Sequence, residues 1–180
     1  MNSLYPSAMS QYALPCGEYK WLNDTQASYF PNIDSVEENG PLGWFFEIDG
    51  EIPVELHDSV KDFVFPCINR PVNRDSLSPR NRRLVEVDGL HWSPSKQKLI
   101  ADLLPKKNIV VHHVALKWMC NNGFNVTKVH RALQFSQKPY LKTFVDTFVN
   151  KRSAAQTKAE KGIYKLILNS AFGKMCECSQ

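Results

Sequence analysis

The sequence of 180 residues lacks the features of a secreted or membrane-spanning protein. No run of 18 or more apolar residues occurs, so a membrane-spanning helix is not expected. No basic region followed by an apolar stretch opens the chain, so no secretory signal is visible. The five cysteines form no Cys-x-x-Cys pair, which favours reduced thiols over a zinc knuckle or a disulfide. We therefore expect an intracellular protein, in the nucleus or the cytoplasm, without a membrane partner.

The composition is that of a globular chain with a mild positive charge. The hydrophobic share of 43% and the aromatic share of 11% predict a buried core within one domain, or one domain with an insertion. The net charge of +4 is compatible with a polyanionic partner. Five arginines lie between residues 70 and 83, and lysines populate the C-terminal part. The arginine cluster fits contacts to a DNA backbone or a partner protein, and an ordinary basic loop is an equally good interpretation.

Local patterns predict a chain of mixed helices and strands. Residues 43–49, 108–113 and 127–135 have the apolar, β-branched or alternating pattern of strands, and a short strand pair is expected at residues 84–92. Helices are expected at residues 4–13 after a strand end, 95–104 with Ser95 as the cap, 115–121, 139–152 and 157–173. Residues 20–41 are expected to form a loop, and residues 58–83 a long exposed excursion.

The last predicted helix carries a stripe of three lysines, an asparagine and a phenylalanine. Helical geometry places Lys158, Lys161, Lys165, Asn169 and Phe172 on one narrow face, because their spacing is three or four residues. Three cations suit a triphosphate, an amide can hydrogen-bond, and an aromatic ring offers a surface on which a base stacks.

A solvated lysine face is the simpler interpretation of this stripe. Solvated faces usually mix charges of both signs, however, and Phe172 would gain little from exposure. Ile163, Leu166, Ile167 and Ser170 lie on other faces, where the apolar members can pack. Gly173 either permits a close backbone approach or caps the helix.

Two motifs at opposite ends of the chain resemble the nucleotide site of family B DNA polymerases. The C-terminal run Lys165-x-x-x-Asn169-Ser170-x-Phe172-Gly173 resembles motif B, in which tyrosine is frequent at the Phe172 position. The N-terminal run Ser3-Leu4-Tyr5-Pro6-Ser7 is similar to the body of motif A, Asp-x-x-Ser-Leu-Tyr-Pro-Ser. Intervening segments are similar to the protein-primed group, which serves adenoviruses, linear plasmids, certain phages and Maverick/Polinton transposons. These segments are Val54–Asp58, Lys107–His112, Thr127–Arg131 and Phe144–Asp146.

This resemblance implies a role for each matching residue. The cations would contact the phosphates of an incoming deoxynucleotide, Tyr5 would exclude a 2′-hydroxyl, and the motif B residues would face the nascent base pair and template. The nucleotide-binding set is Ser3, Leu4, Tyr5, Arg152, Lys161, Lys165 and Asn169. The template- and DNA-binding set is Ser170, Phe172, Gly173 and Lys174. Only the backbone carbonyl of Met1 would touch a metal ion.

The resemblance also implies that the catalytic carboxylates are missing from this sequence. The motif A aspartate would precede Met1, and the Asp-x-Asp pair of motif C does not occur. The family uses two Mg²⁺ ions held by these carboxylates. We therefore expect a polymerase fragment that binds nucleotide and primer–template DNA but is inactive alone. The alternative is a non-catalytic nucleotide- or nucleic-acid-binding module derived from a polymerase gene.

The implied fold is of the α+β class. It comprises part of a polymerase palm, an insertion like the terminal-protein region, and a two-helix fingers subdomain. The expected divisions are residues 1–14 for motif A, 15–138 for the insertion with palm strands, 139–175 for the fingers, and 176–180 for a tail. The expected partners are primer–template DNA, the deoxynucleotide and a terminal protein primer.

Overall fold

The computed structural model describes residues 4–22, 33–89, 91, 97–175 and 177. Met1, Ser3 and Ser95, which the sequence singled out, lie outside these residues. The strands are β1 (Leu14–Trp21), β2 (Leu42–Glu51), β3 (Ile68–Pro71), β4 (Gln97–Ile100), β5 (Lys106–His112) and β6 (Asn125–Lys138). The α-helices are α1 (Leu4–Gln11), α3 (His57–Val60), α4 (Pro79–Glu86), α5 (His113–Asn121), α6 (Lys142–Ala154) and α7 (Lys158–Met175). Short 3-10 turns occur at Ile33–Ser35, Val54–Leu56 and Arg74–Ser76.

An antiparallel sheet of four strands forms the larger part of the fold. The strand order is β1-β6-β2-β5, so β2 and β6 are central. One face of the sheet is covered by α5, and the fully buried side chains Phe46, Ile48 and Ala132 of the sheet pack in one cluster with Leu116 of that helix. We call β1, β2, β5, β6 and α5 the sheet unit. Its apolar cluster is a core of its own.

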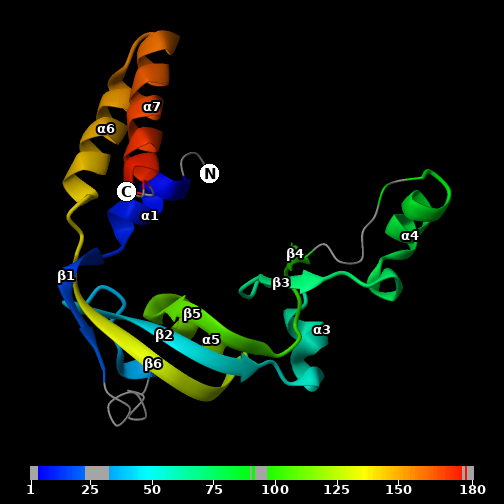
Figure 1. The fold of residues 1–180 in the computed structure, drawn as a ribbon. Coiled ribbons are helices and arrows are strands. Elements are labelled where there is room, and N and C mark those ends of the chain that lie inside the picture. Colours follow the sequence, from blue (N-terminus) through cyan, green and yellow to red (C-terminus); the bar gives the residue numbers. More distant parts are fainter. Residues whose placement is uncertain (1–3, 23–32, 90, 92–96, 176, 178–180) are drawn as a thin grey trace.

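Three helices form a second, separate unit, which we call the helical unit. Helices α6 and α7 lie side by side, and α1 packs across them near the C-terminal part of α7 (Figure 1). A small apolar core joins them, in which Met9 of α1 meets Val145 of α6 and Leu168 of α7. The N-terminal and C-terminal segments of the chain therefore share one core.

A projecting arm extends from the sheet unit. Strands β3 and β4 pair with each other, and α4 lies beyond them, away from the helical unit (Figure 1). The base of the arm is held by Asp102, whose carboxylate pairs with Arg70 at 2.8 Å and with the buried Lys106 at 2.6 Å. Burial raises the pKa of the Asp102 carboxyl, but the hydrogen bond and charge of Lys106 and the charge of Arg70 together hold it below its usual value.

Much of the predicted secondary structure is confirmed. The strands at residues 43–49, 108–113 and 127–135 correspond to β2, β5 and β6, and the helices at residues 115–121, 139–152 and 157–173 to α5, α6 and α7. The helix at residues 4–13 is α1. The antiparallel sheet with separate helices agrees with the predicted α+β class.

Two predicted elements are wrong, and several observed elements were missed. The expected strand pair at residues 84–92 is wrong because the chain there ends helix α4, which Ser78 caps by accepting a hydrogen bond from the Asn81 N–H. The expected helix at residues 95–104 is wrong because Gln97–Ile100 forms β4, paired with β3. Strands β1 and β3 and helices α3 and α4 were not predicted. The excursion at residues 58–83 is mostly exposed, yet it buries Val60 and Phe65 in the sheet core.

Candidate functional site

The first turn of α7 is fixed by a capping box. The Glu160 carboxylate accepts hydrogen bonds from the N–H groups of Gln156 and Thr157, both at 3.2 Å, and the Thr157 hydroxyl accepts one from the Glu160 N–H at 3.2 Å. This reciprocal arrangement satisfies N–H groups that a helix start would leave unpaired. The hydrogen bonds from the Thr157 backbone and side chain lower the pKa of Glu160. The capping box therefore sets where the lysine stripe begins.

The packing of α7 leaves the predicted polar stripe facing outward. Leu168 is buried in the core of the helical unit, with Ala171 packed beside it. Lys161, Lys165 and Asn169 are all exposed. The expectation that the other apolar residues of α7 pack is partly wrong, because Ile163 and Leu166 are 57% and 67% exposed.

The two polymerase-like motifs meet through their aromatic rings. The ring centroids of Tyr5 on α1 and Phe172 on α7 are 4.3 Å apart, with an interplanar angle of 24°. This is a stacked pair, and offset stacking of this kind adds stability beyond burial alone. Leu4 and Tyr5 are themselves 62% and 58% exposed, so this corner of the molecule is open to ligands.

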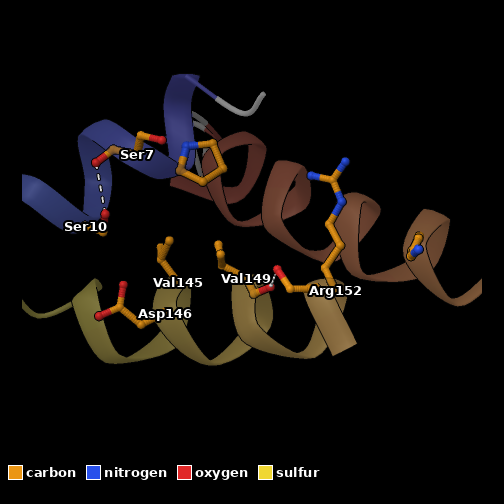
Figure 2. Close-up of a pocket in the computed structure, with 9 residues that line it drawn as sticks. Ser7, Ser10, Val145, Asp146, Val149 and Arg152 are labelled. Carbon is orange, nitrogen blue, oxygen red and sulfur yellow. Dashed lines mark hydrogen bonds between the residues drawn. The ribbon is translucent and has the colours of Figure 1, made fainter. Parts of the chain in front are cut away.

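A pocket of about 460 Å³ lies between α1, α6 and α7. Figure 2 shows Ser7 and Ser10 entering it from α1, while Val145, Asp146, Val149 and Arg152 line it from α6. Pro6, Ser153 and Lys161 complete the lining. The pocket therefore brings together two of the predicted phosphate contacts, Arg152 and Lys161.

The charges around this pocket are unequal. Its lining has two cationic side chains and one acidic side chain, Asp146. Asp146 is paired with Lys142 at 3.0 Å, four residues earlier on α6. Lys165 does not line the pocket and lies one turn beyond Lys161 on the exposed side of α7. An anion in the pocket would therefore meet Arg152 and Lys161.

The predicted DNA-facing residues lie along the C-terminal part of α7. The Ser170 hydroxyl donates to the Leu166 carbonyl at 2.8 Å, and Lys174 pairs with Glu177. The helix continues through Gly173 to Met175, so the interpretation of Gly173 as a cap is wrong. A Cβ at Gly173 would meet no atom within 4 Å, which leaves its surface open to a close approach.

The arginine cluster at residues 70–83 is largely engaged within the arm. Arg74 pairs with Glu86 at 2.7 Å, and Arg82 donates to the Asp75 carbonyl at 3.0 Å. Arg70 holds Asp102, as described above. Within the described residues no such contact is recorded for Arg80 and Arg83 of α4. Three of the five arginines thus stabilise the arm itself.

Three histidines have structural contacts in the sheet unit. His112 accepts a hydrogen bond from the Val114 N–H at the start of α5, and His113 accepts one from the Trp44 N–H. Burial, with the neighbouring His113, lowers the pKa of His112 to about 4. His130 contacts the Asp49 carboxylate at 2.8 Å. Across the described part of the chain, no group of three or more His, Cys, Asp or Glu side chains could hold a metal ion.

The comparisons with known proteins decide the family. The sequence matches the family "DNA polymerase type B, organellar and viral" over residues 1–176. The chain belongs to this family. No curated protein sequence matches it.

Two solved structures of phi29 DNA polymerase share the fold. An orthorhombic crystal form has a TM-score of 0.53 and 18% sequence identity. The match covers 99% of this chain and 26% of the phi29 polymerase chain. A ternary complex with primer-template DNA and incoming nucleotide substrates has a TM-score of 0.52 and 19% sequence identity. The match covers 97% of this chain and 25% of the polymerase chain in that complex. The chain thus spans about a quarter of these polymerases. In the part of this chain that the structure describes, no helix is long and apolar enough to cross a membrane.

Sequence reasoning missed several side chains of this region. Ser7, Ser10, Asp146 and Ser153 line the pocket, although none was predicted as a site residue. Ser7 and Asp146 lie inside segments that resemble the polymerase family, so the resemblance could have indicated them. Ser153 directly follows Arg152 at the end of α6, which no sequence pattern marked.

Proposed function

We propose that this chain supplies the deoxynucleotide- and DNA-binding part of a DNA-directed DNA polymerase. The observation that carries the proposal is the contact between Tyr5 and Phe172, which joins two motifs from opposite ends of the sequence. Membership of the type B polymerase family supports it. The helical unit then corresponds to motif A and the two fingers helices. Residues 15–138 correspond to the insertion that receives a terminal protein primer in the protein-primed group.

The triphosphate would be held by cations of two helices. Arg152 at the end of α6 and Lys161 on α7 line the same pocket, and Lys165 continues the exposed row. Phosphoryl transfer depends on positioning and on neutralising charge on phosphate oxygens. Lysine provides a compact charge with three donors, and arginine a planar fork. The backbone around Ser3 and Leu4 would supply further contacts.

The sugar and base would lie against the aromatic pair. At a centroid distance of 4.3 Å, the rings of Tyr5 and Phe172 leave no space for a sugar or base between them. A nucleotide would therefore separate the rings or lie along their open edge, with Tyr5 under the deoxyribose. Asn169 follows on the same exposed face and would hydrogen-bond to the nucleotide.

The template strand would follow the C-terminal part of α7. Phe172 and Gly173 present a flat ring and an open backbone surface, which suit stacking and close approach of a base pair. Ser170 and Lys174 lie on the same part of the helix. The phi29 ternary complex contains primer-template DNA and incoming nucleotide in a protein of the same fold, which supports a role in binding DNA and nucleotide.

The described residues do not fit the two Mg²⁺ ions that the family uses. Two-metal catalysis requires carboxylates that bridge the ions. Asp146 is the single carboxylate of the pocket lining, and it is paired with Lys142. The proposed contribution of these residues is binding.

A titration with dATP tests the proposal. Replacing Lys165 by alanine removes a charge-assisted contact worth about 1.5–3 kcal/mol, so the dissociation constant should rise about tenfold to a hundredfold. The matched control is Lys98→Ala, which makes the same charge change on exposed strand β4 of the arm. Isothermal titration calorimetry at low salt measures both. Equal dissociation constants for wild type and Lys165→Ala would show that Lys165 does not contribute to nucleotide binding.

A further inference from the structure

The chain crosses twice between the helical unit and the sheet unit. The first linker, residues 12–13, joins α1 to β1, and the second, residues 139–141, joins β6 to α6. Each unit has its own apolar core. An apolar groove of about 710 Å³ lies at the joint, with Met9 and Tyr12 on one side and Trp118 on the other. Because this space is not filled by side chains of the described residues, packing alone does not fix the joint.

The two linkers leave the sheet side by side. Strands β1 and β6 are paired at Leu14 and Lys138, the residues next to the linkers. Pro139 follows Lys138 and has no N–H to continue the ladder. The backbone hydrogen bonds of the sheet therefore end where the linkers begin. The backbone N–H and C=O groups at the joint need other hydrogen-bonding partners.

Asn39 provides such partners at the first linker. Its Oδ1 accepts a hydrogen bond from the Ala13 N–H at 2.8 Å, and its Nδ2 donates to the Gln11 carbonyl at 3.3 Å. The first contact satisfies the backbone just after α1, and the second satisfies a carbonyl of its last turn. One side chain, 26 residues away from Ala13, thus fixes the point at which α1 enters the linker.

The turn that carries Asn39 is anchored next to the second linker. Gln137, which is 3% exposed, donates through Nε2 to the Glu38 carbonyl at 3.2 Å and to the Gly40 carbonyl at 2.9 Å. Its backbone N–H also donates to the Pro41 carbonyl at 3.0 Å. Gln137 precedes Lys138 at the end of β6. A continuous set of hydrogen bonds therefore runs from the second linker through the turn to the end of α1.

The geometry points to Asn39 and Gln137 as positioning residues that set the orientation of the helical unit on the sheet unit. Asn39 bonds the first linker and the end of α1 directly, and Gln137 anchors the turn of Asn39 to the end of β6, which leads into the second linker. The orientation matters because Tyr5, Arg152, Lys161 and Phe172 all belong to the helical unit, whereas the arm belongs to the sheet unit. This role goes beyond the proposed nucleotide binding and does not depend on it.

Native-state proteolysis with chymotrypsin tests this role on the whole chain. A tyrosine stands in each linker, Tyr12 at 40% exposure and Tyr140 at 49%. Loss of two hydrogen bonds in Asn39→Ala should speed cleavage after both tyrosines by about tenfold, because cleavage follows the population of the opened joint. Mass spectrometry of the fragments measures the two rates separately.

The matched control is Asn122→Ala. Asn122 also donates to a carbonyl at a helix end, that of Trp118 at 2.7 Å, but this contact joins α5 to the residue that follows it and involves neither linker. Its cleavage rates after Tyr12 and Tyr140 should equal those of wild type. Unchanged rates in Asn39→Ala would overturn the proposal, and so would acceleration after Tyr12 alone, since Asn39 would then only cap α1.

If Asn39→Ala loses its cooperative thermal transition, a second variant tests the positioning role of Asn39. Asn39→Asp keeps an acceptor for the Ala13 N–H but places an oxygen against the Gln11 carbonyl. We expect intermediate acceleration after both tyrosines, together with a cooperative transition by circular dichroism. Wild-type rates at both sites in Asn39→Asp would contradict the proposed role.

Discussion

At the scale of single residues, the stacked pair of Tyr5 and Phe172 defines the candidate site. An aromatic pair at 4.3 Å is held by contact between the ring faces, and both rings remain partly exposed. The hydroxyl of Tyr5 has no counterpart on Phe172, so the pair is asymmetric in hydrogen bonding. In the proposed site the ring of Tyr5 lies under the deoxyribose, and it is the group that we propose excludes a 2′-hydroxyl.

The residue-scale prediction concerns sugar selectivity. In Tyr5→Ala, the ring that would exclude a 2′-hydroxyl is gone, so the ratio of the ATP to the dATP dissociation constant should fall by about tenfold. Competitive titration of both nucleotides against one fluorescent nucleotide measures the ratio. Tyr19→Ala, which removes a similarly exposed tyrosine from β1, is the control. A ratio that stays at the wild-type value in Tyr5→Ala would contradict the assigned role.

Individual site residues could be predicted to the extent that helical spacing determines them. The three- and four-residue spacing predicted that Lys161, Lys165 and Asn169 share one face of a helix, and they lie in α7, where all three are exposed. The stacking of Phe172 on Tyr5 could not be read from spacing, because it depends on where α1 packs across α7. The same holds for Asp146, which enters the pocket only through the packing of α6.

At the scale of elements, α7 depends on its capping box. Thr157 and Glu160 satisfy each other's backbone N–H groups, and Glu160 also accepts from Gln156. The Thr-x-x-Glu pattern was present in the sequence and marks this helix start. Helix α4 had a comparable signal in Ser78 followed by Pro79.

The element-scale prediction is a pH dependence at the start of α7. The folded pKa of Glu160 is lowered from 4.5, so its stabilisation is present above pH 4.5 and is lost as the pH falls through the folded pKa. In an NMR titration, the amide protons of Gln156 and Thr157 should shift with a common midpoint below 4.5. Glu160→Gln should abolish this transition. A midpoint at or above 4.5 would show that the carboxylate does not cap the helix.

Strands β1 and β4 escaped sequence reasoning because they are formed by distant pairing. Strand β4 exists because Gln97–Ile100 pairs with Ile68–Pro71, and its local pattern suggested a helix. Strand β1 contains Pro15 and an irregular pairing at Gly17, and Glu18 there has a φ of 55°. Such a strand lacks regular alternation, and β6 supplies its hydrogen-bonding partners.

At the scale of the whole molecule, the fold consists of two units and an arm. The helical unit joins the two ends of the sequence, and the sheet unit holds most of what lies between them (Figure 1). The motif order predicted that the ends meet. The separation into two cores, and the hydrogen bonds of Asn39 and Gln137 at the joint, follow from tertiary packing that no local pattern encodes.

Mapping dATP onto the isotope-labelled chain by NMR tests the central claim most directly. If α1 and α7 form one nucleotide site, amide shifts should appear together in residues 4–7 and 161–172, and should titrate with one dissociation constant. The chemical shifts of the amides of β2 and β6 should stay the same as in the free protein. Shifts confined to α7, or centred on the sheet or the arm, would contradict a site built from both ends of the chain.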